Sequence, residues 1–357
     1  MQRLSIALWN ADERRLRALW RQVLALALYV GLLTIAGSMR GLSQSGLPGP
    51  TARWLALPLW QLPPALGALL GIWLLARFVN REPLSAFGLR LNGAWFADCG
   101  CGLALGVLLA GSVLLVEWLL GWVTVTGTLH SGVPPLPYAV AVLSPLLLVA
   151  FAAVFGDLML RAYPIRNLSQ GMRDWAFGPR GALILAWALT IGPVVANFLI
   201  QGQARGAHRT ALTPLNSALA AVMLGLGYVL TGRLGLTMGL HLGWDFSQGS
   251  VFGFPVAGLD TASTASLFVV TQGQDNLWAG LRSFGPTGGL LVTFLFLTGI
   301  LVQVLYVRMR YGPVRLRTEL ARHEMAHEEA ADRRRPRAEA SQPELGARPS
   351  SSSVKAR

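Results

Sequence analysis

Apolar runs of about 20 residues recur along most of this chain, and they constrain its fold more than any other feature. A helix of that length crosses the hydrocarbon core of a bilayer. The composition agrees, because 53% of the 357 residues are hydrophobic and only 13% are charged, whereas a soluble domain carries about 25% charged residues. The sequence therefore predicts an all-α, polytopic helical membrane protein whose surroundings are the lipid bilayer.

The hydropathy pattern predicts about eight transmembrane helices. Their expected ranges are 22–39, 54–76, 98–122, 136–157, 181–200, 214–230, 234–252 and 286–306. The segment 260–280 is less apolar, and we expect it to form a loop or a re-entrant piece.

Three regions follow from this pattern. Residues 1–21 place Leu4, Leu8 and Trp9 among arginines, which predicts a short amphipathic helix lying at the membrane interface. Residues 22–310 form the expected transmembrane domain. Residues 311–357 are basic and polar, so we expect a disordered cytoplasmic tail that buries no core.

The net charge of +13 is almost entirely arginine, since Lys355 is the only lysine. A strongly basic soluble domain would suggest nucleic acid as a partner. Here the arginines gather in alternate short loops and in both terminal regions, as the positive-inside rule requires. We therefore expect no nucleic-acid partner and place both termini in the cytoplasm. The arginine-for-lysine bias suggests a GC-rich bacterial genome, and hence the bacterial inner membrane.

A few polar side chains lie within the predicted spans, where a charge is costly and usually serves a function. They are Asp157, Arg161, Asn197, His241 and Asp245. The first two and the last two are each four residues apart, which places each pair on one helix face. For Asp157 and Arg161 a second interpretation stays open, namely an ordinary ion pair that pins the inner end of the helix.

Imidazole suits proton transfer, and His241 has Asp245 and Gln248 on the same helix face. We therefore predict a site formed by Asp157, Arg161, His241 and Asp245 as catalytic candidates. Three further residues are assigned to substrate binding: Asn197, Trp244 and Gln248.

Glycines at 235, 239 and 243 recur every four residues beside His241. Small residues at this spacing let two membrane helices approach closely, so we interpret the row as a packing surface. Close packing would also hold the histidine rigidly.

Several motifs resemble the CAAX protease and bacteriocin-processing family of intramembrane endopeptidases. That family typically shows Glu-Glu-x-x-x-Arg, then Phe-x-x-x-His, then His-x-x-x-Asn or Asp on separate helices. Residues 241–245 read His-Leu-Gly-Trp-Asp and continue as Phe-Ser-Gln-Gly-Ser-Val-Phe-Gly. The segments 83–90 (Pro-Leu-Ser-Ala-Phe-Gly-Leu-Arg) and 284–290 (Phe-Gly-Pro-Thr-Gly-Gly-Leu) also look like family members. The resemblance covers roughly residues 15–306, and it implies a CAAX protease-like fold.

Two of the three motifs depart from the family pattern. Alignment on Arg161 turns the double glutamate into Gly156 and Asp157, and the second histidine position becomes Val195. The resemblance implies that the first glutamate activates water, the second histidine assists it and the last motif supports the oxyanion. A positioned base typically contributes 10²–10⁴-fold to the rate. Either Asp157 or His241, oriented by Asp245, would have to replace the lost base.

The leading hypothesis is a membrane protein of this fold that acts on, or binds, a peptide or protein within the membrane; the departures at Gly156 and Val195 leave both hydrolysis and impaired hydrolysis open. One alternative is a non-catalytic scaffold that holds a membrane partner in the same cavity. The other is a small-solute transporter in which the histidine and carboxylates relay protons. The sequence leaves the oligomeric state open.

No cofactor or metal is expected. Cys99 and Cys101 form neither a disulfide framework nor a four-cysteine zinc site, and we expect them to pack as small apolar residues. Residues 323–327 read His-Glu-Met-Ala-His, which matches the metalloprotease zinc motif. Because this stretch lies in the charged tail without a shaped cavity, we interpret it as a chance match.

Overall fold

A computed structural model describes residues 8–10, 13–46, 49, 52, 59, 62–134, 136–174, 178–204, 206, 208, 210–257 and 264–323. The described residues up to Arg322 belong to one compact body. Of the remaining residues only His323 is described, so the match to the zinc motif in residues 323–327 lies outside the described residues apart from its first histidine.

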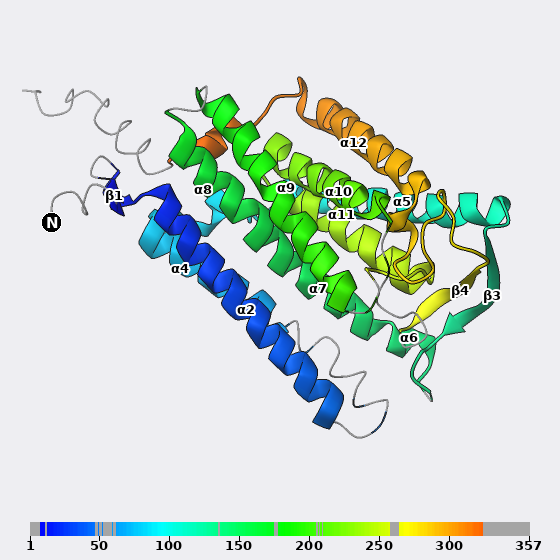
Figure 1. Cartoon of the computed structure of the whole chain (residues 1–357). Coiled ribbons are helices and arrows are strands. Elements are labelled where there is room, and N and C mark those ends of the chain that lie inside the picture. The colour runs from blue at the N-terminus through cyan, green and yellow to red at the C-terminus, as the bar shows by residue number, and fades with distance from the viewer. Residues whose placement is uncertain are drawn as a thin grey trace, which may run out of the picture. The chain divides into compact units, whose positions relative to one another are not determined.

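The body is mostly helical, which confirms the all-α membrane fold. Its helical segments are α2 (Ala18–Gly46), α4 (Leu62–Leu74), η1 (Leu75–Asn80), η2 (Leu84–Phe87), α5 (Gly93–Leu119), α6 (Tyr138–Ala141), α7 (Leu143–Asp157), η3 (Leu158–Ala162), α8 (Tyr163–Met172), α9 (Gly178–Ala204), α10 (Leu212–Thr231), α11 (Gly235–Phe246), η4 (Ser247–Val251), η5 (Pro286–Gly288), α12 (Leu290–Tyr311) and η6 (Thr318–Ala321). Helices α2 and α12 lie on opposite flanks, with α7, α9, α10 and α11 between them (Figure 1).

Within the described residues, seven stretches are long and apolar enough to cross a membrane. They are Ala18–Met39, Leu62–Asn80, Gly93–Leu119, Tyr138–Met172, Gly178–Ala204, Leu212–Thr231 and Leu290–Tyr311. Each contains or overlaps one of the predicted spans. The chain is therefore an integral membrane protein.

The predicted span 234–252 differs from the other seven. It forms α11, a helix of 12 residues, continued by the five-residue π-helical segment η4. This helix is shorter than the flanking spans and most of α11 is buried. The start of α11 lies beside the start of α5, and α11 runs parallel to α5 toward the opposite end of the bundle.

The described part of the N-terminal segment is not the expected amphipathic helix. Strand β1 (Trp9–Asn10) pairs antiparallel with β2 (Arg15–Leu16), and α2 begins at Ala18. The Arg15 side chain is buried and donates to Gln170 on α8 at 3.0 Å. Specific polar contacts with the bundle therefore fix this segment.

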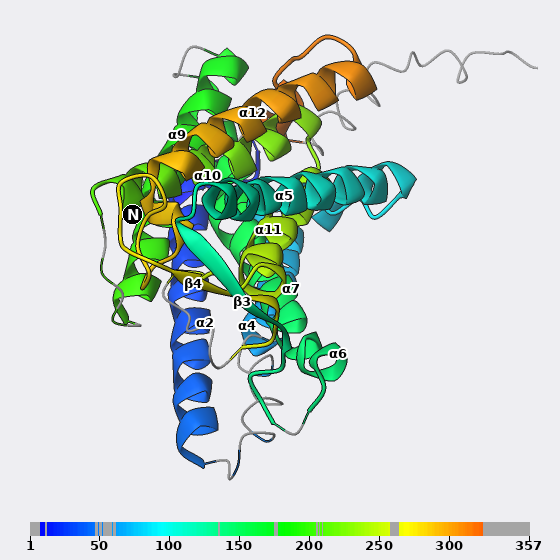
Figure 2. The same ribbon diagram turned by 90° about the vertical axis from the view of Figure 1, so that its right-hand side faces the viewer.

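A two-stranded sheet caps the other end of the bundle, where we expected only loops. Strand β3 (Val123–His130) pairs antiparallel with β4 (Ser266–Gln272), and the two lie far apart in the sequence (Figure 2). The expectation of a loop or re-entrant piece for 260–280 is therefore wrong over β4. Both strands are rich in β-branched residues, which favour strands, but the hydropathy pattern does not report this preference.

The packed body continues beyond the boundary that we placed at residue 310. After α12 the chain turns back, and the amide of Arg317 donates to the carbonyl oxygen of Val229 at 2.9 Å. Leu320 in η6 is buried, and its carbonyl oxygen accepts from Ser169 on α8 at 3.4 Å. Residues 317–322 are therefore part of the body.

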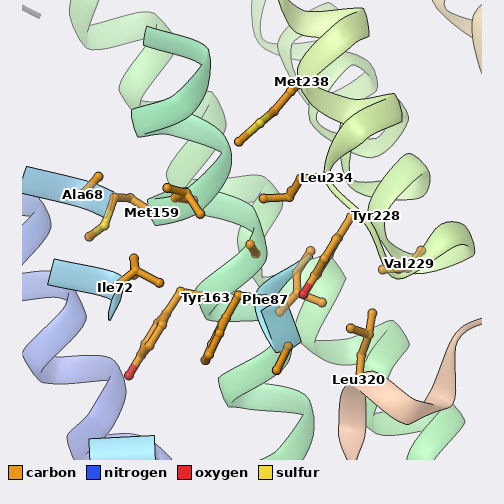
Figure 3. Close-up of a cluster of buried hydrophobic side chains, with 14 of the residues drawn as sticks. Ala68, Ile72, Phe87, Met159, Tyr163, Tyr228, Val229, Leu234, Met238 and Leu320 are labelled. Carbon is orange, nitrogen blue, oxygen red and sulfur yellow. The ribbon is translucent and has the colours of Figure 1, made fainter. Parts of the chain in front are cut away.

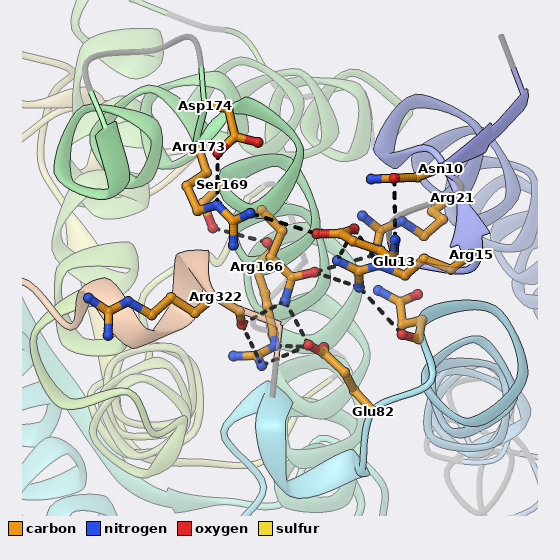
Figure 4. A network of polar contacts seen from close by, with 12 residues as sticks. Asn10, Glu13, Arg15, Arg21, Glu82, Arg166, Ser169, Arg173, Asp174 and Arg322 are labelled. Atoms are coloured by element: carbon orange, nitrogen blue, oxygen red, sulfur yellow. Dashed lines mark hydrogen bonds and ion pairs between the residues drawn. The ribbon is translucent and has the colours of Figure 1, made fainter. Parts of the chain in front are cut away.

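A buried polar network joins four segments at the end of the bundle that carries the N-terminal hairpin (Figure 4). Arg166 on α8 binds both carboxylate oxygens of Glu82 at 2.9 and 3.1 Å. Gln170 donates to Glu82 at 2.9 Å and accepts from Arg15. Arg166 also donates to the carbonyl oxygen of Arg322 at 3.4 Å. The sequence suggests that Arg15 and Arg166 are charges in a terminal region and a loop. In the structure they are buried, and their polar contacts join separate segments of the bundle.

The main apolar core lies next to this network. Phe87 and Tyr163 stack with their ring centroids 5.5 Å apart. Tyr228, Leu234 and Met159 belong to the same cluster of buried side chains (Figure 3). The Tyr163 hydroxyl is hydrogen-bonded to the Asn80 side chain at 2.9 Å, so the core passes directly into the polar network. This packing fixes the position of η3, which contains Met159, and of the start of α8, which is Tyr163.

The predicted glycine row of α11 lies directly against α5. A Cβ atom at Gly235, Gly239 or Gly243 would overlap the backbone carbonyl oxygen of Trp95, Cys99 or Leu103, respectively. No side chain separates the two helices along this row, as is typical of small-residue contacts between membrane helices. The contact fixes the rotation of α11 about its axis, and with it the direction of His241.

Gly239→Ala is expected to destabilise the protein by about 1–3 kcal/mol or more, because the added methyl group meets backbone that cannot rotate away. Gly100→Ala is the matched control, since Gly100 lies on α5 with no heavy atom within 4 Å of the added Cβ. Denaturation in mixed micelles would measure both variants. Equal stability of the two would contradict the close contact between α5 and α11.

Candidate functional site

The four residues predicted to be catalytic lie together on three helical segments. Asp157 is the last residue of α7, and Arg161 lies in the π-helical segment η3 that follows. His241 and Asp245 lie on α11, which packs against α7. The sequence predicted each pair from its spacing, and the tertiary fold places one pair against the other.

Contacts run through the four side chains in a row. Arg161 Nη1 donates to Asp157 Oδ1. The same oxygen lies 3.2 Å from His241 Nδ1, and His241 Nε2 lies 3.4 Å from Asp245 Oδ2. Both nitrogens of one imidazole therefore face a carboxylate oxygen.

This arrangement determines what His241 can do. An ionised carboxylate only accepts hydrogen bonds, so with both carboxylates ionised each ring nitrogen carries a hydrogen and donates. The imidazole then has no free lone pair with which to take a proton from water. His241 is thus placed to donate a proton or a hydrogen bond, and the geometry does not favour it as the base.

The row suits a membrane interior because its charges alternate. With a protonated imidazole, Arg161 and His241 carry positive charge, and Asp157 and Asp245 carry negative charge. Pairing of this kind lowers the cost of holding charges away from water. Asp157 is fully buried, whereas the side chains of His241 and Asp245 are 18% and 26% exposed. Asp157 is therefore an internal support, and the last two residues face the cavity.

A cavity that is partly open to solvent adjoins the row, and the space in it together with the solvent at its mouth is about 560 Å³. Its charged wall consists of Arg161, His241 and Asp245, and the rest is mainly apolar. The other lining residues are Val194, Phe198, Ser217, Ala220, Met223, Leu224, Leu240, Trp244, Thr287 and Phe296. A mostly apolar cavity with a few convergent polar groups is the usual form of a ligand site.

Position 156, where the family resemblance implies the base, faces this charged wall. A Cβ atom built on Gly156 would lie 3.7 Å from His241 Cε1 and 4.0 Å from Arg161 Nη1. These are ordinary van der Waals distances. A side chain at 156 would therefore reach the histidine, but the glycine supplies no carboxylate there.

Asp157, the neighbouring acidic residue, does not face the cavity. Its side chain is fully buried, its Oδ1 atom already contacts Arg161 and His241, and it does not line the cavity. Of the two neighbouring valines on α9, Val194 lines the cavity, whereas Val195, which we aligned with the second histidine, does not.

The three residues assigned to substrate binding separate in the structure. Trp244 lines the cavity. Asn197 does not, and its side chain accepts from the Tyr29 hydroxyl on α2 at 2.9 Å. Gln248 does not line the cavity either; it is buried and donates to the carbonyl oxygen of Pro255. Asn197 and Gln248 therefore link elements of the fold.

Several lining residues escaped prediction from sequence. Ser217 on α10 and Thr287 in η5 contribute the only hydroxyl groups among the described lining residues. Thr287 lies within one of the segments that carry the family resemblance, whereas Ser217 gives no signal because serine is common in membrane helices. Met223 and Phe296 are indistinguishable in sequence from other apolar residues of their spans.

No family model matches the chain, and the searches of curated proteins and of solved structures returned no match. Fold and site therefore define the class of the molecule, an integral helical membrane protein with a charged row at the wall of an apolar cavity.

Proposed function

We propose that this protein is a CAAX protease-like membrane protein whose cavity binds a segment of a membrane-associated peptide or protein, with peptide hydrolysis impaired. The observation that carries the proposal is the position of His241 between two carboxylates at the wall of an apolar cavity. The apolar lining suits the side chains of a membrane peptide. Arg161 supplies donors for a peptide carbonyl oxygen or a terminal carboxylate, and His241 Nε2 can exchange its 3.4 Å contact with Asp245 for one with the ligand.

The impairment follows because no residue of the described cavity wall is placed as a general base. Hydrolysis requires a group that takes a proton from water, and such a group typically contributes 10²–10⁴-fold. Gly156 supplies none, Asp157 is buried behind the row, and His241 faces carboxylates on both sides. Asp245 is the remaining carboxylate among the described lining residues, and it is already engaged with His241. Binding without efficient turnover is the function that this arrangement supports best.

The proposed location is the bacterial inner membrane with both termini in the cytoplasm. The N-terminal hairpin and the segment after α12 both contact α8, so they lie at the same end of the bundle. Arginine is concentrated in the segments at this end, which is typical of the cytoplasmic side.

Peptide binding in lipid nanodiscs tests the proposal. A set of fluorescent membrane peptides would be titrated against the wild type, His241→Ala and Asn197→Ala. Loss of a charge-assisted hydrogen bond at His241 is expected to weaken binding by about 10-fold to 100-fold. Asn197→Ala is the control, because Asn197 is a polar residue of a neighbouring span whose side chain lies outside the cavity lining.

The same samples would be assayed for cleavage. The expected result is binding with little or no product from the wild type. Efficient turnover by the wild type would contradict the impairment, and equal binding by wild type and His241→Ala would contradict the site. Proton-coupled uptake of a small solute without peptide binding would instead support the transporter alternative.

A further inference from the structure

A second charged cluster lies at the end of the bundle that carries the N-terminal hairpin, and the peptide site does not use it. Its centre is Tyr311, the last residue of α12. The Tyr311 hydroxyl lies 2.7 Å from both carboxylate oxygens of Asp98, a buried residue near the start of α5. Tyr306 also donates to Asp98, at 2.7 Å. Asp98 therefore anchors the end of α12 to α5.

Three arginines from three segments surround this tyrosine. Arg233, in the turn between α10 and α11, donates to the Tyr311 hydroxyl at 2.9 Å, and Arg310 donates to it at 3.3 Å. The guanidinium carbons of Arg233, Arg310 and Arg317 lie 5.8, 5.6 and 5.8 Å from the centre of the Tyr311 ring. Cation–π attraction favours each contact, yet it brings like charges together.

The cluster holds more positive than negative charge. Among the described residues, Asp98 is the only carboxylate in contact with these arginines, at 3.1 Å from Arg310 and 3.7 Å from Arg233. Its oxygens already accept from two tyrosine hydroxyls. The side chains of Arg233 and Arg310 are 25% and 34% exposed, so the excess charge is open to the outside of the bundle.

The position of the cluster limits what can balance this charge. Arg233 follows the span Leu212–Thr231, and Arg310 lies in the last turn of the span Leu290–Tyr311. The cluster is thus at the boundary of the membrane, at the level of lipid head groups. Guanidinium groups match the geometry of phosphate oxygens and bind them through paired hydrogen bonds. Basic sites between membrane helices at this level are suited to anionic head groups.

We propose that Arg233, Arg310 and Arg317, arranged around Tyr311, form a binding site for a phosphate group, supplied either by the head group of an anionic phospholipid or by free inorganic phosphate. Tyr311 and Asp98 hold the guanidiniums of Arg233 and Arg310 in place before the ligand arrives. Little side-chain entropy then remains to be lost on binding. The site lies on elements of the packed body, which keeps its geometry fixed.

Binding of both phosphate sources by purified protein tests this proposal. Protein in detergent would be offered phosphatidylglycerol or phosphatidylcholine, with retained lipid counted by native mass spectrometry, and inorganic phosphate in a separate titration. Arg233→Gln/Arg310→Gln is expected to weaken binding of the anionic ligand at least about tenfold. Arg308→Gln is the matched control, because Arg308 is exposed on the same helix and has no side-chain contact with the described part of the cluster.

The two ligands distinguish the sources. Selective retention of phosphatidylglycerol, lost in the double variant, supports a lipid head group; phosphate binding alone, lost in the same variant, supports the free anion. Equal binding of both ligands by wild type and double variant, or binding of neither by the wild type, overturns the proposal. Arg317→Gln covers the case in which the double variant does not fold. Its guanidinium lies over the ring of Tyr311 and donates to the carbonyl oxygen of Leu230, and a loss of a few fold is expected.

Discussion

Gly156→Glu is expected to raise peptide hydrolysis about 10²–10⁴-fold over Gly156→Gln, the range that a positioned general base contributes. A Cβ atom at this position lies at ordinary contact distance from His241 Cε1 and Arg161 Nη1, so the backbone admits a side chain here. The carboxylate would then stand at the cavity wall beside a histidine placed to donate a proton. The measurement is release of product from an internally quenched peptide that the wild type binds.

Glutamine is the matched control because it has the same shape as glutamate and cannot act as a base. Equal rates for the two variants would show that a carboxylate at position 156 is not sufficient for hydrolysis. A histidine added on α9 would then be the next change. Val194 is the position to test first, since it lines the cavity and Val195 does not.

Arg161→Met is expected to lower the free energy of unfolding by about 3–5 kcal/mol, because it leaves the buried carboxylate of Asp157 without its arginine partner. The Asp157 side chain is completely inaccessible, so water does not replace the lost contact. Unfolding in mixed micelles would measure the loss. Arg180→Met is the control, since Arg180 is exposed at the start of α9.

The double variant Arg161→Met/Asp157→Leu separates the ion pair from simple packing. Removing both charges leaves no unpaired buried charge, so the double variant is expected to be more stable than Arg161→Met alone. His241 loses a carboxylate partner in the double variant, and weaker peptide binding should accompany the recovered stability. A double variant less stable than either single variant would show that Asp157 and Arg161 contribute mainly through their packing.

Hydropathy predicted the helical membrane fold because each span must bury its backbone polar groups within one continuous apolar helix. Strands β3 and β4 escaped prediction, since their pairing joins residues far apart in the chain. The N-terminal hairpin escaped for a related reason: Arg15 is held by Gln170 on a distant helix.

The residues of the candidate site also fall into those that the sequence identified and those that only the structure explains. Spacing of four residues within a helix is a local property, so the sequence identified Asp157 with Arg161 and His241 with Asp245 as pairs. Asn197 and Gln248 were indistinguishable in sequence from site residues, because both are polar groups within apolar segments. Their partners, Tyr29 and the carbonyl oxygen of Pro255, are visible only in three dimensions.

The sequence by itself determined that the chain spans a membrane, which charged residues lie inside it, and that the glycine row of α11 is a packing surface. All three follow from local composition and helix periodicity. Only the tertiary structure decided that the two pairs join into one row, that Asp157 lies behind it and that position 156 faces His241. The physical reason is that the contact between α5 and α11 and the π-helical turn at η3 set the rotation of each helix, and no local pattern specifies that rotation.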